Sequence, residues 1–172
     1  MIIEKSVMKT EVKFNDNKEY RYLLKKEWDI KKKKAMVIMI NPSIANKVSM
    51  DFTTLYTLNN LQKLGYGSVD IVNLYPKVTN KLKVDEVSVE EIKINDDLIL
   101  EIAEKVDTII IAWGKKGENS KKIETRQKQL ISILSKFKEK TFLITDEKNN
   151  VGFHPLSPQI RFSWTLKPLY TK

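Results

Sequence analysis

The 172-residue sequence contains no cysteine, which excludes disulfide bonds, thiolate metal ligands and cysteine nucleophiles. It contains a single histidine, His154, so a metal site built from several histidines is excluded as well. No apolar run approaches the roughly 18 residues that a membrane-spanning helix requires, and the first residues do not have the pattern of a signal peptide. We therefore expect a cytoplasmic protein that uses no metal or cofactor and does not bind a membrane.

Arginine is scarce, although the chain as a whole is basic. The sequence has 31 lysine and arginine residues against 22 acidic ones, a formal net charge of +9, and its arginines are Arg21, Arg126 and Arg161. A basic protein attracts polyanions, and DNA or another nucleic acid is the obvious candidate partner. A lysine-rich solvated surface explains the same composition equally well, so the charge leaves both interpretations open.

Four apolar runs have the length of buried strands, at residues 35–40, 69–74, 108–113 and 141–144. Three segments with apolar residues at helical spacing lie between them, at residues 51–64, 89–106 and 120–137. Strands that alternate with helices predict a parallel sheet with right-handed crossovers and helices on both faces. We expect an α/β fold with three layers, α/β/α, around a mostly parallel four-stranded central sheet.

The chain before the first apolar run alternates apolar and polar residues after a turn at Asn15-Asp16-Asn17. This pattern predicts an N-terminal antiparallel hairpin at about residues 10–27. The length suits one domain, and the sequence has no linker, repeat or low-complexity segment. We therefore expect a single α/β domain over residues 1–172, with its core at about 35–160 and a C-terminal tail at 161–172.

Asn41, Asn73, Gly114 and His154 lie just beyond strands or in the loop that follows the last one. The carboxyl ends of parallel strands meet at one edge of a sheet, and α/β proteins bind ligands outside that edge. We therefore expect these four residues, although far apart in the sequence, to line a shared pocket.

Three residues are candidates for catalysis. Asn41 stands at a strand tip fixed by Pro42, so its amide can hold a water, a sugar hydroxyl or a base edge, unless it bonds within its own turn. Asp51 either caps the helix that follows or acts on a water at the pocket rim. His154 lies in a proline-stiffened loop, where it can donate to an anionic oxygen or have a structural role.

Other candidates are suited to bind a base or a phosphate. Asn73 offers a donor and an acceptor side by side, which matches the edge of a nucleobase, and nearby aromatic rings can stack on that base or pack in the core. Lysines in a glycine-bounded turn can meet a phosphate, and a rigid apolar loop tip can enter a base stack. The expected base-binding residues are Asn73, Phe52 and Tyr75, and the expected nucleic-acid-binding residues are Ser43, Lys115, Lys116, Leu156 and Ser157.

Several motifs together resemble a family known as domain of unknown function 1643, and the resemblance runs from about Tyr20 to Pro158. The motifs are Arg21-Tyr22-Leu23-Leu24, Ile40-Asn41-Pro42-Ser43-Ile44-Ala45, Asp51-Phe52-Thr53-Thr54, Gly65-Tyr66-Gly67, Val72-Asn73-Leu74-Tyr75-Pro76, Asn95-Asp96-Asp97, Ala112-Trp113-Gly114 and His154-Pro155-Leu156. The family has no settled activity, so this resemblance alone implies no function.

More distantly, the order of the motifs resembles that of the uracil-DNA glycosylase superfamily. Met39-Ile40-Asn41-Pro42-Ser43 is similar to a motif whose asparagine positions the attacking water, and Val72-Asn73-Leu74 to a strand whose asparagine reads the flipped pyrimidine. The segment His154-Pro155-Leu156-Ser157-Pro158 is similar to a loop whose histidine supports the departing base and whose leucine enters the DNA stack. The resemblance implies a uracil-DNA-glycosylase-like fold and base excision.

The first hypothesis is therefore a DNA-glycosylase-like protein that recognises a flipped base, ordinary or modified, and hydrolyses its N-glycosidic bond. A non-catalytic module of the same fold that binds nucleic acid, a nucleobase or a nucleotide is the first alternative. A hydrolase of small nucleotides is the second. Whether the protein is an enzyme stays open at this point.

Overall fold

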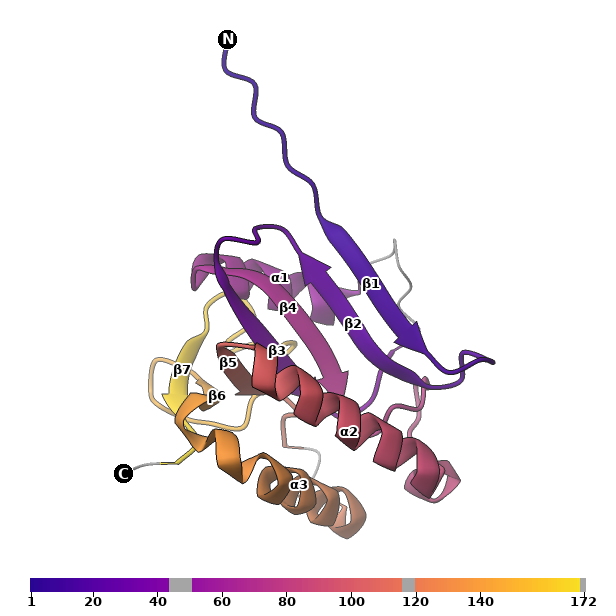
Figure 1. Ribbon diagram of the computed structural model, residues 1–172. Helices are drawn as coiled ribbons and strands as arrows, with labels where there is room; N and C mark the ends of the chain where they lie inside the picture. Colours follow the sequence, from indigo (N-terminus) through magenta and orange to yellow (C-terminus); the bar gives the residue numbers. More distant parts are fainter. Residues whose placement is uncertain (44–50, 116–119, 171–172) are drawn as a thin grey trace.

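Figure 1 shows the computed structural model of the chain, in which residues 1–43, 51–115 and 120–170 are described. These residues form seven strands, three α-helices and two 3-10 helices. The strands are β1 (Lys9–Phe14), β2 (Arg21–Glu27), β3 (Lys33–Met39), β4 (Tyr66–Asn73), β5 (Thr108–Ile111), β6 (Thr141–Thr145) and β7 (Thr165–Pro168). The helices are α1 (Phe52–Lys63), α2 (Val89–Lys105), α3 (Lys121–Ile133), η1 (Val84–Glu86) and η3 (Leu134–Lys140).

All seven strands belong to one mixed sheet with the order β1-β2-β4-β3-β5-β6-β7. β3 pairs in parallel with β4 and with β5, and β5 pairs in parallel with β6. The pairs β1–β2, β2–β4 and β6–β7 are antiparallel. The predicted α/β class is confirmed.

The sheet is larger than the four strands that the sequence predicts. The N-terminal hairpin forms as β1 and β2, but β2 pairs directly with β4 and so extends the main sheet. The segment predicted as a tail contains β7, which pairs with β6 at the opposite edge. Helix α3 ends at Ile133, and its predicted last turn continues as the 3-10 helix η3.

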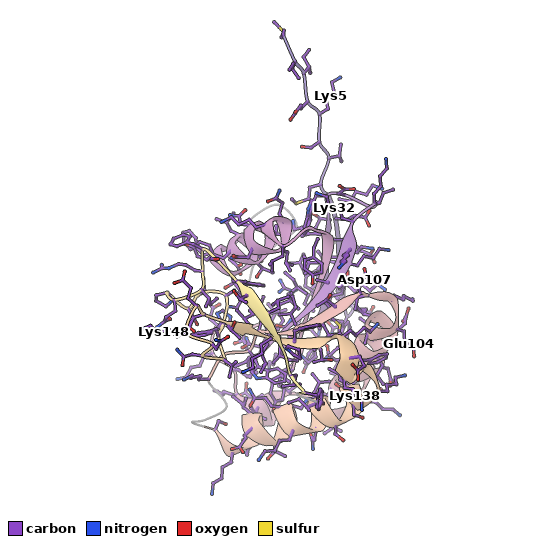
Figure 2. All side chains as sticks on the ribbon, turned by 90° about the vertical axis from the view of Figure 1, so that its left-hand side faces the viewer. Lys5, Lys32, Glu104, Asp107, Lys138 and Lys148 are labelled. Atoms are coloured by element: carbon purple, nitrogen blue, oxygen red, sulfur yellow. The ribbon has the colours of Figure 1, made fainter. Side chains whose placement is uncertain are left out.

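Two apolar clusters lie on opposite faces of the sheet because side chains alternate along each strand. On β3, Met36 and Ile38 belong to one cluster, whereas Ala35 and Val37 belong to the other. Helices α2 and α3 cover the first face, and α1 covers the second, together with the segment that precedes β7 (Figure 1). Charged side chains, including the labelled Lys5, Lys32, Glu104, Asp107, Lys138 and Lys148, are distributed over the exterior (Figure 2).

The connections that follow β3 and β5 leave in opposite directions. The chain passes from β3 through α1 to β4 on one side, and from β5 through α3 to β6 on the other. Such a divergence leaves a crevice outside the carboxyl ends of the two strands, and ligands of open α/β sheets bind there. Within the described residues, no helix is both long enough and apolar enough to cross a membrane.

Candidate functional site

Two adjoining cavities open at the carboxyl ends of β3, β4 and β5. The smaller one has a volume of about 210 Å³ and is lined mainly by polar side chains, whereas the larger one, of about 500 Å³, lies between the ends of β3 and β5. Asn41 and His154 line both cavities. These two residues therefore border both spaces.

The smaller cavity collects predicted site residues from four parts of the chain. Asn41 follows β3, Asn73 ends β4, Asp51 precedes α1 and His154 lies in the loop after β6, and all four line this cavity together with Ser43. Of the four residues expected to share a pocket, Asn41, Asn73 and His154 line the smaller cavity, whereas Gly114 lines only the larger one.

Asn73 is the most constrained of these residues. Its side chain lies at the end of β4 and the residue is only 1% exposed. Its amide nitrogen Nδ2 donates to no other group among the described residues. A buried donor without a partner is costly, so this amide is suited to a ligand that supplies an acceptor inside the smaller cavity.

A buried polar network holds the end of β4 from the opposite face. Asn95 donates from Nδ2 to the carbonyl oxygen of Asn73 at 2.9 Å, and Arg126 donates from Nε to the carbonyl oxygen of Leu74 at 3.2 Å. The guanidinium of Arg126 also binds both carboxylate oxygens of Asp96, with Nη1 at 2.9 Å from Oδ2. The backbone that carries Asn73 is therefore fixed by α2 and α3.

The side chain of Asn41 is held by the loop that follows β4. Its Nδ2 donates to the carbonyl oxygen of Thr79 at 2.7 Å and to that of Pro42 at 3.3 Å. The amide of Thr79 in turn donates to the carbonyl oxygen of Pro42 at 3.2 Å. This arrangement uses the donors of the Asn41 amide within the protein and leaves its oxygen as an acceptor.

Asp51 is both the cap of α1 and a wall of the smaller cavity. Its Oδ1 accepts from the amide of Thr54 at 2.7 Å, and its Oδ2 accepts from the hydroxyl of Ser43. Burial raises the pKa of Asp51, whereas hydrogen bonds from Ser43 and Thr54 and the charge of Arg21 lower it. The lowering effects together outweigh burial, so the pKa lies below its usual value. The carboxylate is therefore ionised at neutral pH.

Arg21 is a site residue that the sequence analysis does not single out. It begins β2, is 5% exposed and lines the smaller cavity, where its Nη1 donates to the carbonyl oxygen of Ser43 at 3.5 Å. Desolvation lowers the pKa of Arg21, and the charge of Asp51 opposes this shift, so the two groups interact electrostatically. The sequence signal that could have pointed to Arg21 is the scarcity of arginine in this lysine-rich chain. A guanidinium is less strongly hydrated than an ammonium, so a cation that must be buried is better supplied by arginine.

The loop of His154 is folded tightly on itself. Nδ1 of His154 accepts from the amide of Leu156 at 3.2 Å, and the backbone of His154 exchanges hydrogen bonds with the amide and hydroxyl of Ser157. Because Nδ1 is an acceptor, the neutral imidazole carries its proton on Nε2, which is a donor.

Gly114 allows this loop to approach the end of β5. A Cβ atom at Gly114 would lie 3.0 Å from Cβ of His154, and the residue has a positive φ of 69°. Only glycine accepts both conditions without strain. The glycine after β5 therefore permits the close approach of His154.

The larger cavity has an aromatic and apolar lining. Trp113 and Phe153 contribute rings, and Leu156, which is exposed, contributes its apolar side chain. Lys115 and Ser157 also line this cavity. Lys116, the other lysine of the predicted basic turn, lies outside the described residues.

Two predicted base-binding residues are not brought to these cavities. Phe52 is 69% exposed on α1 and stacks on Tyr56, with ring centroids 6.2 Å apart. Tyr75 is 2% exposed and packs in the cluster beneath α2 and α3, because β4 ends at Asn73 and the alternation of faces is lost beyond it. Neither ring lines the cavity that contains Asn73.

Among the described residues, no group of three histidine, aspartate or glutamate side chains is placed to hold a metal ion.

Comparison with protein-family models gives a match over residues 21–156, which includes the strands that carry both cavities. Searches of curated proteins and of solved structures give no match. The matched model spans well over half of the chain, and the protein belongs to the family that this model describes, protein of unknown function (DUF1643).

Proposed function

We propose that the protein binds a nucleobase extruded from a nucleic acid, ordinary or modified, in the smaller cavity and hydrolyses its N-glycosidic bond. The observation that carries this proposal is the buried Nδ2 of Asn73, which has no partner among the described residues and belongs to a residue that lines the smaller cavity with Asp51 and His154. An asparagine amide pairs with the donor and acceptor edge of a base. The volume of about 210 Å³ is below the about 300 Å³ of pockets for drug-sized ligands, which suits one ring system.

The chemistry divides among the lining residues. Asn73 holds the base edge, and the amide oxygen of Asn41 accepts a hydrogen bond from the attacking water. The water oxygen bonds to C1′ of the sugar as the bond from C1′ to the base nitrogen breaks. The carboxylate of Asp51 takes the proton of the water, and Nε2–H of His154 donates to the base, which leaves as an anion.

We also propose that the substrate is a nucleic acid and that the protein acts on it in the cytoplasm. The net charge of +9 favours approach to a polyanion. We further propose that β4, β3, β5 and β6 with their helices correspond to a uracil-DNA-glycosylase-like core, because Asn41 and Asn73 stand at the carboxyl ends of β3 and β4 and His154 lies in the loop that follows β6.

A second candidate is a non-catalytic reader that uses the same cavity. Both oxygens of Asp51 already accept hydrogen bonds, from Ser43 and from the cap of α1, and the Asn41 amide is bound to backbone carbonyl groups. Groups engaged in this way can hold a base without performing hydrolysis. The two candidates make different predictions for the same variants.

The test incubates the protein with single strands and duplexes that carry uracil, mismatched bases or hypermodified bases, and measures abasic sites by alkaline cleavage. For the enzyme, Asn41→Ala lowers turnover by about 10²-fold or more while affinity is retained. Asn73→Ala weakens binding of the base-bearing strand by about 5- to 150-fold, the effect of one lost buried hydrogen bond. Asn59→Ala, an exposed asparagine on α1, is the matched control and changes neither quantity.

Binding that depends on Asn73 without base release from any substrate refutes hydrolysis and supports the reader. If base release is unchanged in both Asn41→Ala and Asn73→Ala, the smaller cavity is not the site of the reaction. Activity on free nucleotides together with negligible binding to strands at moderate salt refutes the nucleic acid substrate.

A further inference from the structure

The larger cavity has no role in holding the base, and its size and position require an explanation. It adjoins the smaller cavity at Asn41 and His154, lies where the connections of β3 and β5 diverge, and has a volume of about 500 Å³. This volume falls within the about 300–1,000 Å³ typical of sites for whole small ligands. A base in the smaller cavity leaves this second space unfilled.

The aromatic and apolar lining of the larger cavity, with one lysine, suits a nucleotide. Trp113 and Phe153 are the aromatic residues of this lining, and base stacking on aromatic side chains is tolerant of base identity. Among the described residues that line this cavity, Lys115 is the only lysine, arginine, aspartate or glutamate. Its stem lies across Gly152, where an added Cβ would be 3.7 Å from Cγ of Lys115. Two aromatic residues and one cation in the same lining match a base and its phosphate.

We propose that the larger cavity binds the nucleotide next to the extruded one, with its base against Phe153 and Trp113 and its phosphate at Lys115. This inference rests on the proposed function and specifies its substrate class. The substrate is a nucleic acid strand of at least two linked nucleotides, because a free nucleoside or mononucleotide occupies only the smaller cavity. His154 and Asn41, which line both spaces, stand where the sugar joins the two halves of the ligand.

The experiment measures binding without requiring the identity of the target base. The probe is an oligothymidine of about ten nucleotides with one central tetrahydrofuran residue, which has no base, and thymidine 5′-monophosphate is the single-nucleotide probe. Affinities are measured by isothermal titration calorimetry over a range of salt concentrations. The variants are Phe153→Ala, Phe153→Leu and Lys115→Gln, with Phe162→Ala and Lys93→Gln, which line neither cavity, as matched controls.

We expect Phe153→Ala to weaken binding of the strand by about tenfold, as loss of one stacked base does. Phe153→Leu, which preserves apolar volume and guards against misfolding, weakens binding by a similar factor because it also lacks a ring. Lys115→Gln reduces the salt dependence of strand binding by about one phosphate contact, whereas Lys93→Gln does not. Asn73→Ala weakens binding of this probe less than binding of an oligothymidine with a base at every position, because the abasic residue offers Asn73 no base edge.

Equal affinity of the wild type and both Phe153 variants for the strand overturns the inference. Equal weakening of strand and mononucleotide binding by Phe153→Ala also overturns it, since the larger cavity then holds the target base itself. If strands carrying a target base bind through Asn73 but independently of Phe153, the proposed function stands and the second subsite does not exist. If no strand binds and no base is released, the proposed function fails as well.

Discussion

Replacement of Gly114 by alanine tests whether the close approach of the His154 loop to β5 is needed for the site. Gly114 has a φ of 69°, and an L-residue in the left-handed region costs about 1–2 kcal/mol. Alanine also lowers the conformational entropy of the unfolded chain, which stabilises the folded state by about 0.4–1 kcal/mol. The backbone change alone therefore lowers the free energy of unfolding by about 1 kcal/mol.

The contact with His154 adds a second cost. The new Cβ would lie 3.0 Å from Cβ and 3.4 Å from the amide nitrogen of His154, so the loop must shift outward. Overpacking of this kind costs about 1–3 kcal/mol. We therefore expect Gly114→Ala to lower the free energy of unfolding by about 2–4 kcal/mol in total, which a domain with a stability of about 5–15 kcal/mol survives.

Gly65→Ala is the matched control. Gly65 also has a positive φ, of 83°, but an added Cβ would meet no atom within 4 Å. Gly65→Ala should therefore lower the free energy of unfolding only through the backbone, by about 1 kcal/mol. The assay is urea denaturation followed by tryptophan fluorescence, together with release of the base by each folded variant. Equal stability and equal base release in the two variants would refute the role of Gly114 in placing His154.

Two further variants test the supports of the site. Asp96→Ala leaves the buried guanidinium of Arg126 without its carboxylate partner and should lower the free energy of unfolding by about 3–5 kcal/mol, measured by urea denaturation. Glu101→Ala, which removes an exposed helical ion pair, should leave stability almost unchanged, and equal effects of the two would contradict the argument. The pKa of Asp51 is lower in the folded state, so its stabilising contribution is complete above about pH 4 and is lost as the pH falls through the folded-state pKa. The stability difference between wild type and Asp51→Asn should therefore shrink between pH 7 and pH 3, and a constant difference would exclude this linkage.

The parts of the fold that the sequence predicts are those with a local signal. Helices α1 and α2 lie within one residue of the ranges that apolar spacing indicates, because each has one continuous buried stripe. β7 has no such signal: its burial pattern is mostly exposed, and it forms a strand only because the edge of β6 is available. The pairing of β2 with β4 is likewise a property of the assembled sheet.

The same distinction applies to the site. Asn41 and Asn73 are predictable because each stands at the end of an apolar strand, where topology determines the neighbours. Arg21 stands at the beginning of an antiparallel strand, and only the position of β2 beside β4 brings it to the carboxyl edge. Tyr75 lies two residues after Asn73, but the strand has ended and the expected face is no longer maintained.

The residues that line the two cavities are spread along the chain from Arg21 to Gln159. During synthesis, Asn41 and Asn73 leave the ribosome long before the loop that contains His154. The set of residues that lines the two cavities is therefore complete only when nearly all of the domain has emerged and can fold as a unit.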